Sequence, residues 1–267
     1  MPADFCGQVV WITGASSGIG EALAQGFAQA GARLVLSSRR ETELERVRRA
    51  CARPDEHLVL PLDLARTDTF AAATAMVLAR CGTIDVLVNN AGVAQRALAS
   101  EATLAVERAL MEVNYFGPVA LTKAVLPAMR ARRRGRVVVV GSVLGHFGFP
   151  GNSTYSAAKH ALRGYFDSLR AEVWRDGIKV TLVSPGYVRT AVSANAVGPA
   201  GEKSPRPPSP RGISPERCAA AIIRGVARGR EHLYPGGPEV AAVYLARFAP
   251  WLFSQLARRM KPRTADT

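Results

Sequence analysis

The sequence predicts an α/β protein in which a doubly wound parallel sheet forms a single domain. Short apolar runs alternate along the chain with longer amphipathic stretches, which is typical of buried strands covered by helices. The run Val137–Val140 consists only of valine, as expected of a strand that is covered on both faces. The 267 residues fit one domain of this class, and we find neither an internal repeat nor a linker to a second domain.

Each predicted strand is a short apolar run, and each predicted helix is a longer stretch with apolar residues at helical spacing. In chain order, the predicted strands are Val9–Thr13, Arg33–Ser37, Leu58–Pro61, Val86–Asn89, Val137–Val140, Val180–Val183 and His232–Tyr234. The predicted helices are Ile19–Ala30, Glu41–Ala50, Phe70–Ala79, Leu104–Met129, Ala157–Trp174, Pro215–Arg228 and Glu239–Met260. Gly31 ends the first helix, and Pro118, Pro127 and Pro250 predict irregularities in the fourth and the last.

The segment 192–214 breaks this alternation. Its larger part, Val197–Ser214, is rich in proline and glycine and cannot form a regular helix or strand. A loop of this length in a compact domain is typical of a functional lid or of a disordered segment. We predict a flexible lid at 192–214 and, at 239–267, a C-terminal extension made of an apolar helix and a basic tail.

The composition excludes several other classes of protein. With 48% hydrophobic and 21% charged residues, neither disorder nor a fibrous repeat is expected. No apolar run reaches the ~18–20 residues that cross a bilayer. The four cysteines and four histidines lack metal-ligand spacing, so we expect no metal site and free thiols in a reducing compartment, the cytoplasm. The net charge of +14 would suit a polyanionic partner, but a compositional bias towards arginine explains it equally well, so charge alone does not identify a partner.

A glycine-rich loop follows the first predicted strand. The segment Thr13–Gly20 reads TGASSGIG and leads directly into the first helix. Glycines let the backbone approach a ligand closely, and free N–H groups at a helix N-terminus bind a diphosphate. An ordinary turn is the alternative. We predict a dinucleotide site whose candidate residues here are Gly14, Ser16, Ser17, Gly18, Ile19 and Gly20.

The end of the second predicted strand indicates which dinucleotide is bound. An NAD-binding protein of this class usually has a carboxylate there, but this chain reads Ser38-Arg39-Arg40 with no acid before Glu41. A guanidinium can bind a 2′-phosphate through two hydrogen bonds. We predict NADP(H), with Arg39 as the main contact and Arg40 or Ser38 assisting. The alternative is that both arginines are merely solvated at the start of a helix.

The loop spacing G-x-x-x-G-x-G, together with Asn89-Asn90-Ala91-Gly92 after the fourth strand, resembles the short-chain dehydrogenase/reductase family. The resemblance extends from Gly7 to about Pro235 and implies a Rossmann fold. The cofactor contacts that it implies are Asp63 and Leu64 at the adenine, Asn90, Ala91 and Gly92 on the ribose side, and Pro185, Gly186, Val188 and Thr190 at the carboxamide.

Tyr155 and Lys159 form a Y-x-x-x-K motif, which places both side chains on one face of a helix. A phenol with a pKa of ~10 becomes an acid–base catalyst near neutral pH when an ammonium favours its phenolate. The resemblance adds Ser142, which would bind the substrate carbonyl, and Asn114, which would position a proton-relay water. It also implies that Tyr155 and Lys159 contact the cofactor. We predict the catalytic set Asn114, Ser142, Tyr155 and Lys159.

These residues predict an NADPH-dependent carbonyl reductase that acts on a hydrophobic, lipid-like or steroid-like ketone and also catalyses the reverse oxidation. Two alternatives are a reductase of 3-oxoacyl groups on carrier protein and a cofactor-sensing regulatory protein on the same fold. Three stretches, 161–172, 184–197 and 243–255, most resemble the subgroup of dehydrogenase/reductase member seven and its acyl/alkyl-dihydroxyacetone-phosphate reductase relative. We do not expect the N-terminal membrane anchor of those relatives here. His146, four residues after Ser142, is a candidate for the substrate pocket wall.

The long helices and the charged segments predict the kinds of partner that this protein has. The family pairs through two long helices, here Leu104–Met129 and Ala157–Trp174, which implies a homodimer or homotetramer. The arginine run 132–134 lacks interleaved aromatic residues, so no nucleic-acid partner is expected. The apolar stretch Val240–Leu256 and the basic residues after it suit the surface of an anionic membrane. Packing over the substrate cleft or a partner subunit is the alternative.

Overall fold

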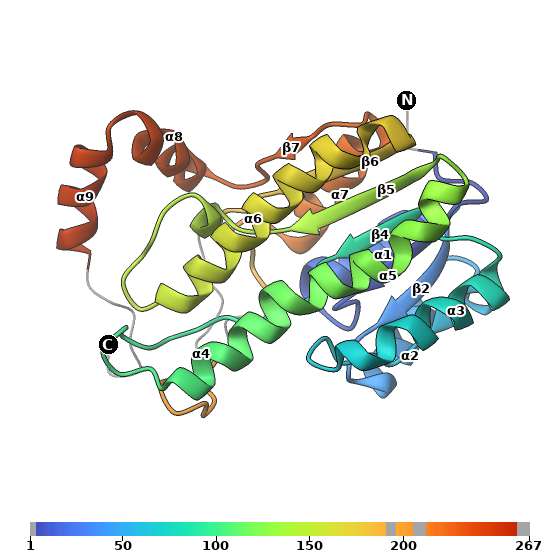
Figure 1. Cartoon of the computed structure of the whole chain (residues 1–267), viewed down its shortest axis with the longest axis horizontal. Helices are drawn as coiled ribbons and strands as arrows, with labels where there is room; N and C mark the ends of the chain where they lie inside the picture. Colours follow the sequence, from blue (N-terminus) through green and yellow to red (C-terminus); the bar gives the residue numbers. More distant parts are fainter. Residues whose placement is uncertain (1–3, 191–195, 205–211, 261–267) are drawn as a thin grey trace.

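The computed structural model describes residues 4–190, 196–204 and 212–260. In this part of the chain, parallel strands form one sheet in the order β3-β2-β1-β4-β5-β6-β7 (Figure 1). Their bounds are β1 Val9–Thr13, β2 Arg33–Ser37, β3 Leu58–Val59, β4 Val86–Asn89, β5 Gly135–Val140, β6 Ile178–Val183 and β7 His232–Leu233. The predicted doubly wound parallel sheet is confirmed, because the strand order reverses direction between β1 and β4.

Helices cover both faces of the sheet (Figure 1). One face carries α1 (Gly18–Gln29), α2 (Glu41–Ala50) and α7 (Pro215–Ala227). The other face carries α3 (Phe70–Cys81), α5 (Gly117–Ala131) and α6 (Ser153–Val173). The helix α4 (Leu104–Met111) extends the line of α5 beyond the sheet.

The strand residues alternate between two hydrophobic layers. Along β1, Val10 and Ile12 pack into the layer that contains Phe27 of α1, whereas Trp11 packs into the layer that contains Phe166 of α6. All five of these side chains are completely buried. Because both faces are covered, the strands read as continuous apolar runs, which is why the sequence predicts them well.

The predicted helix Leu104–Met129 is not continuous. A π-helical turn, Glu112–Phe116, separates α4 from α5. Pro118 stands at the start of α5, where a missing N–H costs little, and Pro127 lies inside α5 without ending it. The irregularity therefore surrounds Asn114 and precedes both prolines. This π-turn rotates Asn114 into the interior, where it is fully buried.

The C-terminal part forms two helices that project from one end of the molecule (Figure 1). They are α8 (Ala241–Phe248) and α9 (Pro250–Arg259), and they separate at Ala249, so the predicted break near Pro250 is confirmed. The basic residues Lys261 and Arg263 of the predicted tail, like 192–195 and 205–211 of the predicted lid, lie outside the described residues. Among the residues that are described, no helix has the length and apolar character to cross a membrane.

Candidate functional site

The predicted site residues gather at one edge of the sheet, where the parallel strands end. The glycine loop follows β1, Asn90 follows β4, Ser142 follows β5 and Pro185 follows β6. In open α/β sheets, ligands bind outside the carboxyl ends of the strands, at the point where the strand order reverses. The topology therefore brings four distant segments of the sequence to one place.

The glycine loop is built so that no side chain intrudes on it. Gly14 and Gly18 have φ angles of +66° and +60°, which favour glycine. A Cβ at Gly20 would lie 2.1 Å from the carbonyl oxygen of Gly14. A Cβ at Gly18 would come within 3.0 Å of the methyl group of Thr190. The loop thus presents bare backbone and the N-terminus of α1, a cradle that fits a diphosphate.

The side chain of Asn90 is hydrogen-bonded to the backbone of this loop. Its Nδ2 donates to the carbonyl oxygens of Thr13, at 2.9 Å, and of Gly14, at 3.2 Å. The Thr13 hydroxyl accepts from the N–H groups of Asn90, at 3.0 Å, and Ala91, at 3.2 Å, and donates to Val88. In this structure the side chain of Asn90 therefore shapes the cofactor loop.

An arginine and three serines meet beside the glycine loop. Nη2 of Arg40 donates to the hydroxyls of Ser16, at 2.9 Å, and Ser17, at 3.2 Å. The Ser38 hydroxyl accepts from the backbone N–H of Arg40. Arg39 is exposed next to this group. The cluster combines a guanidinium with hydroxyl donors, which is the chemistry that binds a phosphate.

The segment after β3 lies at the same edge of the sheet. Leu62 N–H donates to the carbonyl oxygen of Ser38, so the chain passes directly beside the arginine–serine cluster. The carboxylate of Asp63 accepts from Ala65 N–H, and Leu64 is buried. That Asp63 and Leu64 contact the adenine stays a prediction.

Ser142, Tyr155 and Lys159 come together at the end of β5. The side chain of Ser142 lies close enough to the Tyr155 phenol to lower its pKa. Nζ of Lys159 lies 5.7 Å from the centre of the Tyr155 ring and donates to the carbonyl oxygen of Val140, at 3.1 Å. Lys159 is buried, whereas Tyr155 is half-buried. The hydroxyls of Ser142 and Tyr155 and the ammonium of Lys159 thus lie close enough together to act on one small group of a substrate.

Burial dominates the proton affinities of this pair. It raises the pKa of the Tyr155 phenol, and the hydrogen bond from Ser142 opposes this effect. Burial lowers the pKa of Lys159 to about 8. At neutral pH the phenol is therefore protonated and the ammonium is mostly charged, which is the state suited to donating a proton.

Asn114, on the π-turn before α5, lies close to the same group of residues. Its Oδ1 accepts from Val93 N–H, and its Nδ2 donates to the Val93 carbonyl oxygen, both at 2.9 Å. A Cβ at Gly92 would lie 2.9 Å from Oδ1 of Asn114 and 3.5 Å from Nζ of Lys159. The amide of Asn114 thus fixes the loop after β4 against the π-turn.

The turn after β6 is held by Glu239, a residue that no sequence motif singles out. Oε1 of Glu239 accepts from the N–H groups of Tyr187, at 2.7 Å, and Gly237, at 2.9 Å. Val188 pairs with Ile213 in an isolated parallel bridge, while Pro185 accepts from Val143 N–H. Glu239 lies far from this turn along the chain, and no local motif marks it.

His146 is half-buried and contacts the same turn. Its Nε2 lies 2.9 Å from the Ser184 hydroxyl, and its ring packs 5.5 Å from that of Tyr234. Burial and the nearby Arg163 lower the pKa of His146 to about 4, so the imidazole is neutral at pH 7. No cluster of His, Cys, Asp and Glu within the described ranges could hold a metal ion.

Comparison with known proteins identifies the family. A family model described as short chain dehydrogenase matches residues 8–199. The chain is 44% identical to a "Dehydrogenase/reductase SDR family protein 7-like" from Anopheles gambiae, over 95% of this chain and 84% of that protein. It is 39% identical to human "Dehydrogenase/reductase SDR family member 7", over 94% and 78%. These names agree with the subgroup that the sequence resembles.

Solved structures agree with this relationship. A short-chain dehydrogenase from Streptomyces avermitilis superposes with a TM-score of 0.79 and 33% identity, over 94% of this chain and 96% of that one. An alcohol dehydrogenase from Thermococcus sibiricus, complexed with 5-hydroxy-NADP, has a TM-score of 0.75 and 26% identity, over 86% and 97%. From the family match, the sequence identities and the shared fold, this chain belongs to the short-chain dehydrogenase/reductase family of oxidoreductases.

Proposed function

We propose that this protein is an NADPH-dependent carbonyl reductase in which Tyr155 is the proton donor. The grouping of Ser142, Tyr155 and Lys159 at the end of β5 carries this proposal. Two neighbouring hydroxyls can both donate to one carbonyl oxygen placed between them. Polarising that oxygen and protonating it is what reduction of a ketone requires.

In the proposed mechanism each residue has a separate task. Ser142 donates a hydrogen bond to the ketone oxygen and polarises the carbonyl. Tyr155 transfers its proton to that oxygen as negative charge develops, and the ammonium of Lys159 stabilises the phenolate that is left. Asn114 holds the loop after β4 beside Lys159. NADPH, when bound, supplies the hydride.

The glycine loop and the arginine–serine cluster support NADP(H) as the cofactor. The loop offers bare backbone to a diphosphate, and Arg40 with Ser16 and Ser17 offers donors to a 2′-phosphate. The related Thermococcus sibiricus enzyme binds an NADP derivative, and a metagenomic short-chain oxidoreductase with 31% identity was solved in complex with NADP. We propose that Arg39, Arg40 and Ser38 together bind that phosphate.

The substrate is proposed to be a hydrophobic ketone of lipid-like or steroid-like character. Aromatic rings from the loop after Ser142 meet rings from the C-terminal part. Phe147 lies 4.9 Å from Phe253 of α9, and Tyr234 lies 6.4 Å from Tyr244 of α8. Aromatic rings in the loop that follows Ser142 favour an apolar substrate. NADPH oxidation rates across ketosteroids, 3-oxoacyl esters, acyl-dihydroxyacetone phosphate and aromatic ketones would rank these classes.

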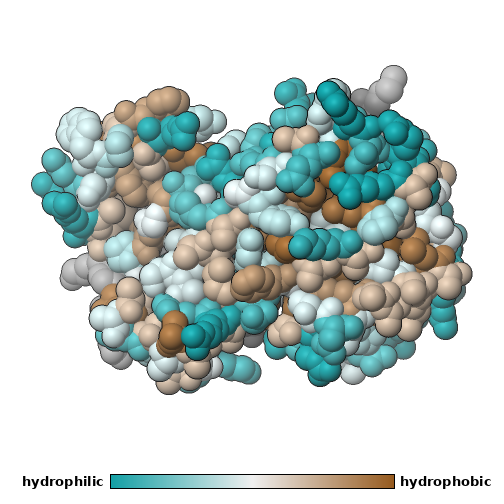
Figure 2. All heavy atoms as spheres, viewed as in Figure 1, coloured by the Kyte–Doolittle hydropathy of each residue, from teal (hydrophilic) through white to brown (hydrophobic). Residues whose placement is uncertain are grey.

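Self-association is proposed to use the outer face of α4 and α6. An open groove of about 450 Å³ lies there, and it includes none of the four proposed catalytic residues. Leu104 and Phe116 beside it are 58% and 47% exposed. Figure 2 shows this face with apolar and weakly polar colours over its middle, where α5 and α6 lie. We propose a homodimer or homotetramer formed through this face.

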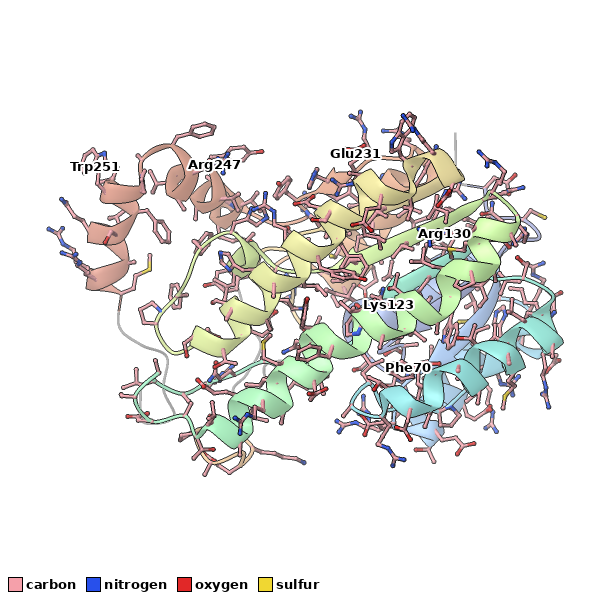
Figure 3. The ribbon with its side chains drawn as sticks, in the orientation of Figure 1. Phe70, Lys123, Arg130, Glu231, Arg247 and Trp251 are labelled. Atoms are coloured by element: carbon pink, nitrogen blue, oxygen red, sulfur yellow. The ribbon has the colours of Figure 1, made fainter. Side chains whose placement is uncertain are left out.

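Peripheral contact with an anionic membrane is proposed for α8 and α9. Phe248 is 80% exposed and Trp251 66% exposed, although both are large hydrophobic residues. Figure 3 labels Trp251 and Arg247 at the outer end of the molecule, away from the sheet. Arg258 and Arg259 follow in the last turn of α9. Aromatic rings at headgroup depth with arginines on lipid phosphates would suit such a surface.

The proton-donor role predicts the effect of Tyr155→Phe. The ring remains but the transferable proton is lost, so NADPH should still bind while ketone reduction falls about 10²-fold or more. Tyr165→Phe makes the same chemical change farther along α6 and serves as the control, with near-normal turnover expected. Steady-state rates and NADPH fluorescence titration measure both effects. Normal turnover in the Tyr155 variant would contradict the assignment.

The phosphate site predicts how cofactor preference changes. Ser38→Asp with Arg39→Leu should shift the kcat/KM ratio towards NADH, because a carboxylate repels the 2′-phosphate and accepts from a ribose hydroxyl. Single Arg39→Leu and Arg40→Leu variants show which guanidinium carries the phosphate. Arg49→Leu at the far end of α2 is the control. A wild-type enzyme that already prefers NADH would refute the charge argument.

The pKa of Lys159 predicts a pH profile. Its charged form is present below pH 8 and is lost as the pH rises through about 8. Because kcat/KM for NADPH reports the free enzyme, this quantity should be level below pH 7.5 and fall about tenfold per pH unit above 8. In Lys159→Arg any remaining activity should lack this decline, since guanidinium stays charged. A wild-type profile that is flat to pH 10 would rule the prediction out.

Membrane contact predicts binding of the full-length protein to anionic vesicles. Cosedimentation with phosphatidylserine-containing vesicles at low salt should fall severalfold when Phe248 and Trp251 are both changed to serine. Trp174→Ser is the matched control, because Trp174 is 63% exposed but lies beyond the end of α6. Neutral vesicles should bind weakly. Equal binding by all variants would show that another basic surface of the protein contacts the vesicles, and it would contradict this prediction.

A further inference from the structure

The first turn of α6 needs hydrogen-bond acceptors that its own sequence does not supply. The first N–H groups of a helix have no partner inside it. Asn152 occupies the N-cap position of α6, but its side chain forms no capping bond. The amide of Tyr155 is among the groups concerned. How this turn is capped therefore bears directly on where the Tyr155 hydroxyl lies.

A distant residue, Gln95, caps this turn. Its Oε1 accepts from the N–H groups of Thr154, at 2.9 Å, and Tyr155, at 3.2 Å. Its Nε2 lies 3.4 Å from the Thr154 hydroxyl, which in turn donates to the carboxylate of Glu107 on α4. Gln95 is completely buried. A buried amide side chain that satisfies two helix N–H groups at once is a fixed part of the structure.

The backbone around Gln95 is held by the segment 196–204. Arg96 N–H donates to the Val197 carbonyl oxygen at 2.8 Å, and Val197 N–H donates to the Ala94 carbonyl oxygen at 3.0 Å. Thr103 N–H donates to Pro199. This segment belongs to the long loop after β6 that the sequence predicts to be a lid. The backbone on either side of Gln95 is thus hydrogen-bonded to that loop, while the side chain of Gln95 accepts from the N–H of Tyr155.

We propose that Gln95 is a positioning residue that couples the docking of segment 196–204 to the placement of Tyr155. The cap keeps the first turn of α6 in the position that places Tyr155 beside Lys159 and Ser142. Undocking of Val197 releases the backbone of Gln95 and loosens the cap. The inference rests on the proposed role of Tyr155 as proton donor, since a change of about 1 Å in such a group costs up to about 10²-fold in rate.

Gln95→Met tests the cap, because it keeps the length of the side chain but removes the amide. We expect kcat to fall about tenfold or more with the NADPH dissociation constant within about twofold of wild type. Hydrogen exchange measured by mass spectrometry should rise in the peptide that covers 152–158 and not in β1. Gln29→Met at the exposed end of α1 is the control. Unchanged kcat and unchanged exchange in Gln95→Met would overturn the proposal.

Val197→Pro tests the coupling, because it removes the N–H that donates to Ala94. The single variant should lower kcat, and the double variant with Gln95→Met should be no worse than Gln95→Met alone. Effects that multiply independently would overturn the coupling. Exchange of the 152–158 peptide needs no substrate, so it tests the cap even if Tyr155→Phe were to refute the proposed function. Loss of activity in Tyr155→Phe with normal kcat in Gln95→Met would refute this inference alone.

Discussion

The parallel pairing of β1 with β4 is the contact on which the rest of the site depends. Their register sets Val10 opposite Val86 and Ile12 opposite Val88, so both strands end at the same level. The Thr13 hydroxyl then bonds the segment after β4 to the end of β1, and Asn90 bonds back to the glycine loop. Without this pairing, the glycine loop would lose the hydrogen bonds that Thr13 and Asn90 make beside it.

A second constraint is that helix termini at this edge need partners from elsewhere in the chain. The N-terminus of α1 is left open above glycines, which suits an anionic ligand. The N-terminus of α6 is closed by Gln95, and the turn after β6 is closed by Glu239. At one edge of the sheet, the N-terminus of α1 thus has no side-chain cap, whereas that of α6 is capped by Gln95.

Much of the fold could be predicted because burial on both faces leaves a clear pattern. The predicted bounds of β1, β2, α2 and β4 are the observed ones. The predicted helix Leu104–Met129 is wrong at Glu112–Phe116, because a π-turn is selected by the burial of Asn114 and has no local signal. The start of α6 at Ser153, four residues before the predicted start, likewise depends on an acceptor supplied by Gln95.

The sequence by itself determined the fold class, the family and the candidate residues, because glycine spacing, Y-x-x-x-K and apolar runs are local patterns. Only the tertiary structure decided how those residues contact each other. In the folded chain, Arg40 donates to the hydroxyls of Ser16 and Ser17, and Asn114 is hydrogen-bonded to the backbone of Val93. The tertiary structure also assigned Gln95 and Glu239 to the support of the site. The physical reason is that a hydrogen bond between residues far apart in sequence depends on the packing of the whole sheet, which no local pattern records.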